Sequence, residues 1–366
     1  MTVSTIDALT AHDPGHVPVM LAEVISALAP KAGGRYVDGT FGGGGYSRAV
    51  LREAACTVWG IDRDPTAIHR AEALAAALRD DDAGRTGTAA RHLVPVSGTF
   101  GAMSDLLASE APFDGIVLDI GVSSYQLDEA ERGFSFRQDG PLDMRMSSAG
   151  RSAADLVNES DESALADIIY HYGEDRLSRR IAAAIVRARA EEPIRTTARL
   201  ADIVRGVVRP DKSGIHPATR TFQALRIAVN DELGELQAAL DDAPALLDRN
   251  GVFVVVTFHS LEDRLVKRAF AKAAGRVSRP SRHEPMAERD IRPDYHLPHA
   301  RPVLASEDEI ARNPRARSAK LRSLVRSTEV ATHSASPGSD PVAPAFSGAD
   351  RAPHFRSLNS VSGPRS

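Results

Sequence analysis

Short apolar runs alternate with amphipathic stretches along the first part of the chain, and another apolar run follows near residue 252. Apolar residues at helical spacing predict a helix at 17–28, ahead of the first strand. The apolar runs predict strands at 35–41, 56–61, 93–97, 115–120 and 252–258. Strands that alternate with helices favour an α/β fold with a doubly wound parallel sheet and helices on both of its faces.

The alternation stops near residue 146, and the pattern over 152–247 is almost entirely helical. Apolar residues spaced three or four apart predict one helix over 177–188 and a longer single helix over 222–240. We therefore predict an inserted helical domain at 140–220 within a sheet domain made of 16–139 and 221–328. A flexible arm is predicted at 1–15 and a disordered tail, rich in Ser, Pro, Ala and Gly, at 329–366.

Composition adds limits on the class of protein. The chain has 366 residues, a formal net charge of −4 and a pI of about 6.3, which exclude a protein that is basic throughout but not a local basic face. Its single cysteine, Cys56, excludes an intrachain disulfide and indicates a reducing compartment. No secretory signal pattern is found, and the longest apolar run is too short to cross a bilayer. We expect a cytoplasmic protein without a membrane partner.

The most informative stretch is the first predicted strand with its loop, Tyr36-Val37-Asp38-Gly39-Thr40-Phe41-Gly42-Gly43-Gly44-Gly45-Tyr46-Ser47. Consecutive glycines allow a sharp turn and let a ligand approach the backbone, here at Gly43, Gly44 and Gly45. The next strand ends in Asp62, where an acid accepts hydrogen bonds from ribose hydroxyls. This order predicts a nucleotide-binding βαβ unit, and the alternative is a surface turn without a ligand.

The glycine spacing argues against a phosphate ligand. It matches neither G-x-G-x-x-G nor G-x-x-x-x-G-K-[ST]. The carboxylate of Asp38 would repel a pyrophosphate, but it could hold an ammonium group. S-adenosylmethionine carries an ammonium, a sulfonium and a ribose but no phosphate, so these residues favour it as the cofactor.

Two further strand ends carry polar groups. Asp119 ends the strand 115–120 and His259 follows the strand 252–258, and ligands of open α/β sheets bind beside the carboxyl ends of strands. We assign Asp119 to the cofactor site and take Asp119 and His259 as the candidate catalytic groups. The alternatives are that Asp119 caps the next turn and that His259 is structural. Ser260 and Asp263 predict a capping box at the start of the following helix.

The segment 131–146 is dense in charged residues, aromatics and glycine, which predicts a long functional loop. Phe134 and Phe136 are candidates to stack on a nucleic-acid base, and Arg132 and Arg145 to contact phosphates. The alternative is that both phenylalanines only hold the loop against the domain.

Basic residues concentrate in two other segments, 176–199 and 312–326. Solvated helix faces commonly carry such runs, but in a net-acidic chain they also favour a separate phosphate-binding face. His283, His296 and His299 are scattered without zinc-site spacing, so no metal site is predicted.

Together these motifs resemble the bacterial 16S ribosomal RNA cytosine-N4 methyltransferase family over about 16–326. The matching pieces are His16-Val17-Pro18-Val19-Met20-Leu21, Asp38-Gly39-Thr40-Phe41-Gly42, Asp62-Arg63-Asp64-Pro65, Leu118-Asp119-Ile120-Gly121-Val122-Ser123-Ser124, Glu131-Arg132-Gly133-Phe134-Ser135-Phe136, Pro141-Leu142-Asp143-Met144-Arg145-Met146, His216-Pro217-Ala218-Thr219-Arg220-Thr221-Phe222-Gln223-Ala224, Phe258-His259-Ser260-Leu261-Glu262-Asp263-Arg264 and Asn313-Pro314-Arg315-Ala316-Arg317-Ser318. The resemblance implies a class I methyltransferase (Rossmann-like) fold whose helical insert recognises RNA. It also implies methyl transfer from S-adenosylmethionine to the exocyclic amine of a cytidine in the decoding centre of 16S rRNA, within the small ribosomal subunit.

By position, the resemblance implies cofactor contacts at Gly44, Gly45, Tyr46, Asp62, Phe100, Asp119 and Gln126. The family often has His where this chain has Tyr46, and the end of the strand at Asp119 lacks the D/N-P-P-Y/F motif of many amino-methyltransferases. Two rival functions are a nicotinamide-dependent oxidoreductase and a non-catalytic ribosome-assembly factor that binds RNA through its arginine-rich surfaces.

Overall fold

The computed structural model describes residues 18–82, 90–122, 124–147, 149–210, 214, 216–276 and 294–328. The predicted arm at 1–15 and the predicted tail at 329–366 lie outside these residues.

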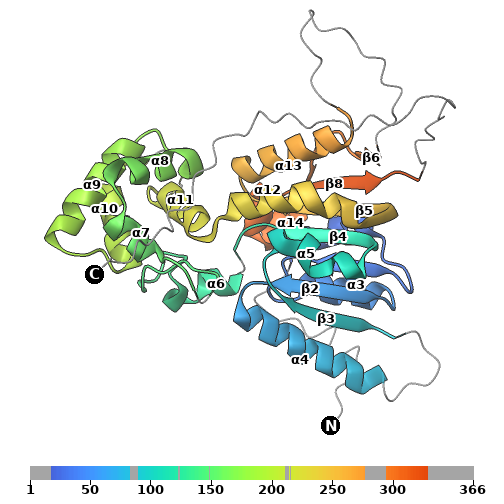
Figure 1. Cartoon of the computed structure of the whole chain (residues 1–366). Coiled ribbons are helices and arrows are strands. Elements are labelled where there is room, and N and C mark those ends of the chain that lie inside the picture. Colours follow the sequence, from blue (N-terminus) through green and yellow to red (C-terminus); the bar gives the residue numbers. More distant parts are fainter. Residues whose placement is uncertain are drawn as a thin grey trace, which may run out of the picture. The chain divides into compact units, whose positions relative to one another are not determined.

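Within the described residues, one eight-stranded sheet has the order β3-β2-β1-β4-β5-β8-β6, with β7 paired to β8 (Figure 1). The strands are β1 Arg35–Asp38, β2 Thr57–Asp62, β3 His92–Ser97, β4 Phe113–Asp119, β5 Leu247–Thr257, β6 Tyr295–His296, β7 Val303–Leu304 and β8 Lys320–Arg326. Strands β1 to β5 are parallel, and β8 runs antiparallel to β5. The doubly wound α/β sheet is therefore confirmed, while β8 was not predicted because three of its seven residues are basic.

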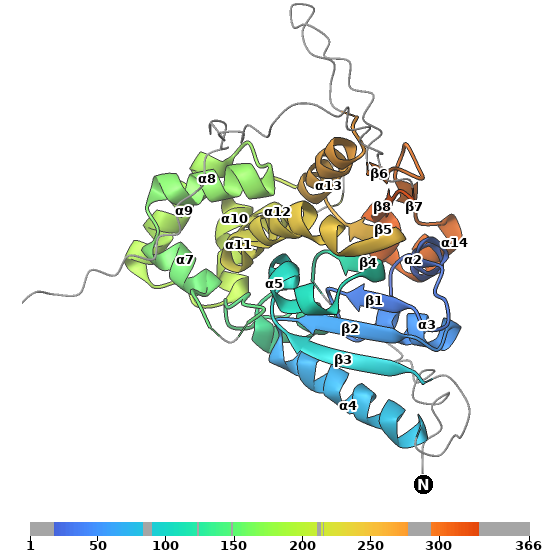
Figure 2. The same ribbon diagram turned by 45° about the vertical axis from the view of Figure 1, so that its right-hand side comes forward.

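Helices cover both faces of the sheet, as Figures 1 and 2 show. One apolar cluster joins the sheet to α2 (Leu21–Leu28), α3 (Gly45–Glu53) and α4 (Pro65–Asp82). A second joins it to α5 (Met103–Leu107), α12 (Glu232–Asp242) and α13 (Ser260–Ala273). Alternate residues of β5 face the two clusters: Val254 packs into the first and Val255 into the second, as the twofold period of a strand requires. Burial on both faces explains why the central strands β1, β2, β4 and the second half of β5 are continuous apolar runs.

The helical part has a core of its own and stands beside the sheet (Figures 1 and 2). Its helices are α7 Ala153–Glu159, α8 Glu162–Gly173, α9 Ser178–Glu191, α10 Thr197–Val207 and α11 Thr219–Asn230. Each supplies fully buried residues to that core, for example Leu165, Ile181 and Leu225. The remaining helices are short: α6 Ser124–Asp128, α14 Glu307–Arg312, and the 3-10 turns η1 Phe100–Ala102, η2 Ala108–Glu110, η3 Ala130–Arg132, η4 Ala243–Leu246 and η5 Pro314–Ser318.

The single helix predicted over 222–240 is wrong, because α11 and α12 are separated at Asp231, which has a left-handed φ of 49°. The apolar spacing continues across the break, so periodicity alone cannot reveal it. Phe222 of α11 packs into the core of the helical part, whereas Leu236 of α12 packs under the sheet. By its contacts α11 therefore packs with the helical part.

A buried ion pair holds the two helices at this break. Arg226 Nε lies 2.8 Å from Glu232 Oε1, and Arg226 Nη2 lies 2.8 Å from Glu232 Oε2. The side chains are 16% and 7% exposed. We expect Glu232→Gln to lower the free energy of unfolding by about 3 kcal/mol, because Arg226 keeps its charge without a charged partner.

Denaturant unfolding of the variant measures this loss. The matched control is Asp202→Asn, which breaks a pair with Arg205 whose side chains are 56% and 59% exposed. An exposed pair contributes less than about 1 kcal/mol. Equal losses in the two variants would mean that the pair at the helix break does not stabilise the fold through burial.

Candidate active site

Strand β1 ends two positions before its neighbours β2 and β4, which leaves a notch in the edge of the sheet. Three carboxylates flank this notch. Asp38 ends that strand and lies level with Gly60 of β2 and Val117 of β4. Asp62 and Asp119 each lie two positions further along their own strands, so they stand on either side of Asp38. Successive side chains alternate between faces, so all three acids lie on the same face of the sheet. The strand order reverses between β1 and β4, which is where open α/β sheets bind ligands.

Asp38 shapes the glycine loop. It is 2% exposed, and its Oδ2 accepts hydrogen bonds from Ser47 N at 3.2 Å and Ser47 Oγ at 2.7 Å. Burial raises the pKa of Asp38 to about 6. The hydrogen bonds from Ser47 and Thr40 oppose this rise, and the charge of Asp62 adds to it. The carboxylate is thus engaged within the loop, and its contact with an ammonium group stays a prediction.

Asp62 links the loop to the end of β2. Its Oδ2 accepts from Gly42 N at 2.8 Å, and its Oδ1 accepts from Asp64 N at 2.8 Å. Burial raises the pKa of Asp62 above its ordinary value, although these two backbone bonds oppose the rise. Each oxygen keeps a second acceptor position, so binding of ribose hydroxyls is compatible with the observed contacts.

The loop needs glycine at two positions for its packing. Gly44 has a left-handed φ of 76°, and a Cβ there would lie 2.6 Å from Phe41 Cζ. At Gly45 a Cβ would lie 2.1 Å from Pro18 Cγ. These close approaches explain why side chains are excluded from the turn. The contact of Gly43, Gly44 and Gly45 with a cofactor stays a prediction.

Tyr46 uses its polar group inside the protein. The residue is 4% exposed, its ring lies in the cluster under α2 and α3, and its hydroxyl donates to the carbonyl of Val19. A hydrogen bond from this hydroxyl to a cofactor is therefore not supported. A backbone contact at Tyr46 stays a prediction.

The other predicted cofactor residues lie around the same strand ends. Gln126, in α6, is 8% exposed, and its Nε2 lies 3.4 Å from Asp64 Oδ2. Phe100 opens the turn η1 and approaches the loop, since a Cβ on Gly39 would lie 3.4 Å from Phe100 Cβ and 2.4 Å from Leu118 Cδ2. Gln126 thus lies beside Asp64 and Phe100 beside Gly39, and their contact with a cofactor stays a prediction.

Asp119 is the least satisfied acid of the site. Its backbone N donates to Thr40 Oγ1 at 2.7 Å, but its buried Oδ1 has no hydrogen-bond partner among the described residues. Burial, followed by the charges of Asp38 and Glu262, raises the pKa of Asp119 to about 8. A buried carboxylate without a partner is costly, so a cation or a hydrogen-bond donor brought to this atom would be bound favourably.

His259 is the N-cap of α13. The capping box consists of His259 and Glu262, one residue before the predicted pair of Ser260 and Asp263. Glu262 N donates to His259 Nδ1 at 3.4 Å, and His259 Nε2 lies 2.8 Å from Glu262 Oε1, although without hydrogen-bond alignment. Both ring nitrogens therefore face Glu262, which favours the structural alternative for His259 over a catalytic one.

The four predicted substrate contacts all have partners within the chain. Phe134 is 6% exposed in the core of the helical part. Phe136 packs against His216 and, edge to face, against Phe222, with ring centroids 4.5 and 4.8 Å apart. These contacts support the alternative that the phenylalanines hold the loop against the domain.

Both arginines of that set are bound as well. Arg145 pairs with Asp143 through contacts of 2.8 and 2.7 Å, and Arg132 Nη2 lies 2.8 Å from Asp64 Oδ2. Burial alone would raise the pKa of Asp64, but hydrogen bonds from Arg132 and Thr66 lower it overall. Phosphate binding by Arg132 would require this pair to break.

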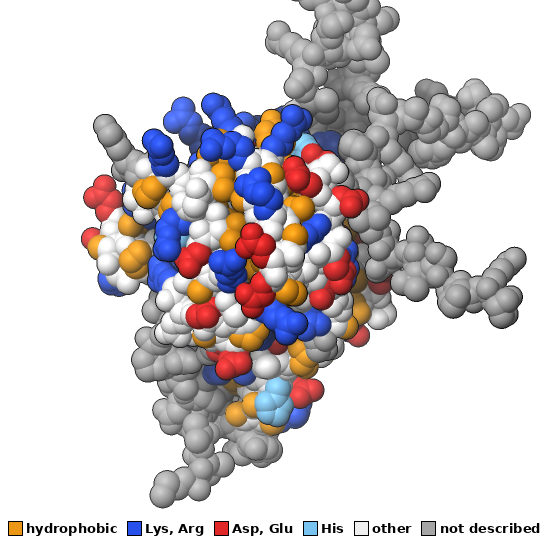
Figure 3. Space-filling view, turned by 90° about the vertical axis from the view of Figure 1, so that its left-hand side faces the viewer, with side chains coloured by type: hydrophobic (Ala, Val, Ile, Leu, Met, Phe, Trp, Pro, Cys, Tyr) orange, Lys and Arg blue, Asp and Glu red, His pale blue; other side chains and the backbone are white. Residues whose placement is uncertain are grey.

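Some arginines of the two basic segments are bound within the protein, and others are exposed to solvent. Arg189 Nη1 donates to the carbonyls of Val157 and Ser160 at 2.7 Å each, and Arg322 Nε donates to Asp263 Oδ1 at 2.7 Å. Figure 3 faces the helical part and shows Lys and Arg side chains gathered over its upper region, with acids among them lower down. The exposed members of the two segments are Arg176, Arg179, Arg180, Arg187, Arg195, Arg199, Arg312, Arg315 and Arg317.

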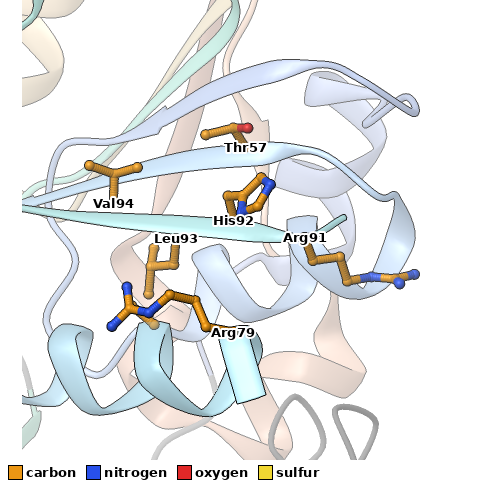
Figure 4. A pocket seen from close by; sticks show the side chains of 7 residues that line it. Thr57, Arg79, Arg91, His92, Leu93 and Val94 are labelled. Atoms are coloured by element: carbon orange, nitrogen blue, oxygen red, sulfur yellow. The ribbon is translucent and has the colours of Figure 1, made fainter. Parts of the chain in front are cut away.

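A separate hollow of about 320 Å³ lies at the start of β2 and β3, the opposite ends of these strands from the acids. It is lined by Thr57, Arg79, Arg91, His92 and neighbouring apolar residues (Figure 4). The guanidinium groups of Arg79 and Arg91 point away from each other, so they do not converge on one anion. Among the described residues, no group of three or more His, Cys, Asp or Glu could hold a metal ion.

Sequence reasoning gave no role to Asp64 or Glu262, although both fall inside quoted motifs. The sequence did offer a signal in their position: Asp64 lies two places after Asp62, and Glu262 lies three places after His259. The structure places Asp64 between Asp62 and Arg132, and Glu262 close enough to Asp119 to raise its pKa.

Comparison with known proteins adds an independent finding. The MraW methylase family matches residues 13–327 of the chain. A protein of Gluconobacter oxydans (strain 621H) named "Ribosomal RNA small subunit methyltransferase H" is 60% identical over 320 residues, covering 87% of this chain and 96% of the relative. A protein of the same name from Acidiphilium cryptum (strain JF-5) is 55% identical over 315 residues, covering 85% and 97%.

Proposed function

Since the chain belongs to the MraW methylase family, we propose that it methylates N4 of a cytidine in the decoding centre of 16S ribosomal RNA. It is a methyltransferase, and its methyl donor is S-adenosylmethionine. Its relatives are named for the ribosomal RNA of the small subunit, which supports that RNA as the substrate here. Family membership also argues against the rival function of a nicotinamide-dependent oxidoreductase.

The observation that carries the proposal is the unpartnered Oδ1 of Asp119 in a notch that contains other acids. We expect the cofactor to fit this site, because Asp38 and the ionised form of Asp119 would offer negative charge to its cationic groups and Asp62 would offer acceptors to its ribose. Glycines at 44 and 45 keep side chains out of the adjoining turn. When bound, S-adenosylmethionine supplies a methyl group that its positive sulfur activates.

The protein must then make a poor nucleophile react. The lone pair of a cytosine N4 is delocalised into the ring, so an acceptor that binds an N4 hydrogen helps to localise it. As the new N–C bond forms, N4 must lose one proton, and we assign Asp119 as the group that accepts it. The protein would also hold the amine in line with the methyl group and exclude water, which lowers the barrier to transfer further.

The RNA partner is expected to meet the exposed arginines of the helical part, because phosphates are bound mainly by Lys and Arg. We propose that the protein acts on small ribosomal subunits in the cytoplasm. None of the described helices has the length and apolar character needed to cross a membrane.

The decisive experiment incubates the purified protein with unmethylated small subunits and labelled S-adenosylmethionine, then maps the label by mass spectrometry. We expect a single N4-methylcytidine in the decoding centre. Label at another base or atom would refute the substrate assignment. Binding of the subunits without any transfer would instead support the non-catalytic assembly factor.

A further inference from the structure

The loop of residues 129–146 is a packed unit. Its two ends meet where Met144 N donates to the carbonyl of Arg132 at 3.0 Å. A Cβ on Gly133 or Gly140 would lie 2.1 or 2.0 Å from a backbone oxygen of the same loop, so the backbone segments are in close contact. A displacement at one point of this loop is therefore transmitted to the whole of it.

Arg132 connects the loop to the end of β2. Its Nη2 donates to Asp64 Oδ2 at 2.8 Å and also contacts the carbonyls of Arg145 at 3.2 Å and Met146 at 3.4 Å. The Asp64 side chain is 5% exposed and that of Arg132 is 22% exposed. Separating two charges so poorly solvated costs several kcal/mol, so Asp64 and Arg132 move together.

Asn230, at the end of α11, makes a second connection to the same loop. Its Oδ1 accepts from Met146 N at 2.8 Å, and its Nδ2 donates to the Met144 carbonyl at 2.7 Å. Its own carbonyl accepts from Arg63 Nη1 at 2.8 Å. Arg63 and Asp64 are consecutive, so both connections start directly after the acid assigned to the ribose.

We propose that Arg132 is a positioning residue that couples occupancy of the ribose site at Asp62 to the placement of the loop 129–146 against RNA. The coupling rests on the proposed function. Asp64 N donates to Asp62 Oδ1, so any adjustment of Asp62 on binding ribose reaches Asp64 and then Arg132. Through Arg132 it reaches the loop, and coupling of this kind is reciprocal, so RNA tightens cofactor binding by the factor by which the cofactor tightens RNA binding.

The test measures the affinity of radiolabelled S-adenosylhomocysteine by equilibrium dialysis, with and without saturating unmethylated small subunits. We expect the subunits to tighten binding by about 5-fold or more in the natural protein, within the usual range of such couplings. In Arg132→Gln the affinities measured with and without subunits should become equal, whatever the level of S-adenosylhomocysteine binding without RNA. Asp64→Asn should have the same effect, and the double variant should lose nothing further.

The matched control is Arg137→Gln, which removes the same charge from an exposed position of the same loop. This control should keep the coupling ratio, even where its RNA affinity falls. Melting curves establish that each variant is folded, and Arg132→Lys provides a second variant should Arg132→Gln fail to fold.

The two hypotheses fail in different ways. No methyl transfer by the natural protein would refute the proposed function. Transfer with equal S-adenosylhomocysteine affinities in the presence and absence of subunits would refute the coupling alone. So would an unchanged ratio in Arg132→Gln, or an equal loss in Arg137→Gln, because the effect would then be one of loop charge.

Discussion

Asp119→Asn is expected to reduce the rate of methyl transfer by about 100- to 10,000-fold, the range for loss of a general base. Asparagine keeps the size of the side chain but cannot accept a proton from N4. The rate is measured in single turnovers with saturating cofactor and small subunits, so that weaker binding does not enter. Asp105→Asn, the same change at an exposed helical position, should leave the rate unaltered.

The same residue sets a pH dependence. Burial and neighbouring acids hold the pKa of Asp119 at about 8, so the carboxyl is largely protonated at neutral pH before the cofactor binds. A cationic cofactor prefers the ionised form, so S-adenosylmethionine should bind more tightly as pH rises towards 8, with release of a proton. The free energy of unfolding depends on pH in the opposite direction. Because the pKa of Asp119 is raised in the folded state, this group stabilises the fold at low pH, and its contribution is lost as pH rises from about 4 to about 8.

Calorimetry of cofactor binding between pH 6 and pH 9, in buffers of different ionisation enthalpy, measures both the affinity and the proton released. In Asp119→Asn the affinity should lose its dependence on pH between pH 7 and pH 9, and only the titration of Asp38 near pH 6 should remain. A natural protein whose affinity is flat across the range would show that Asp119 does not face the cation.

Asp62→Ala is expected to weaken S-adenosylmethionine binding by at least about 100-fold. Two hydrogen bonds from ribose hydroxyls to a carboxylate are lost, each contributing about 1.5–3 kcal/mol. The variant also releases Gly42 N and Asp64 N, which Asp62 now holds, so the loop loses part of its support. Titration calorimetry measures the affinity directly.

Asp62→Asn is the informative companion, because it keeps one acceptor oxygen and the shape of the side chain. Its affinity should fall between those of the natural protein and Asp62→Ala. Affinities that are unchanged in both variants, with normal melting temperatures, would contradict the assignment of the ribose to Asp62.

Sequence alone was sufficient for the five parallel strands and for the convergence of three acids, but not for β6, β7 and β8. The central parallel strands are buried on both faces, so they are visible as apolar runs. Parallel strands bring their carboxyl ends to one edge, so Asp38, Asp62 and Asp119 had to meet once the strands were assigned. None of this requires knowledge of contacts between distant side chains.

The roles of individual side chains in the loop and at the helix ends needed coordinates. Phe134 and Arg132 have residue types that suit nucleic acid, yet the same types also fill a core and neutralise a buried acid, as they do here. His259 could be placed beside the notch but not oriented, because its ring direction depends on Glu262. The break at Asp231 preserves helical spacing, so only backbone angles reveal it.

The contact between Pro18 and Gly45 constrains how homologous chains can diverge. The pyrrolidine ring fills the space beside the glycine Cα, so any larger residue at 45 needs something smaller at 18. Two sites far apart in an alignment should therefore change as a pair, or not at all. The few residues ahead of the first helix thereby share the evolutionary constraint of the glycine turn.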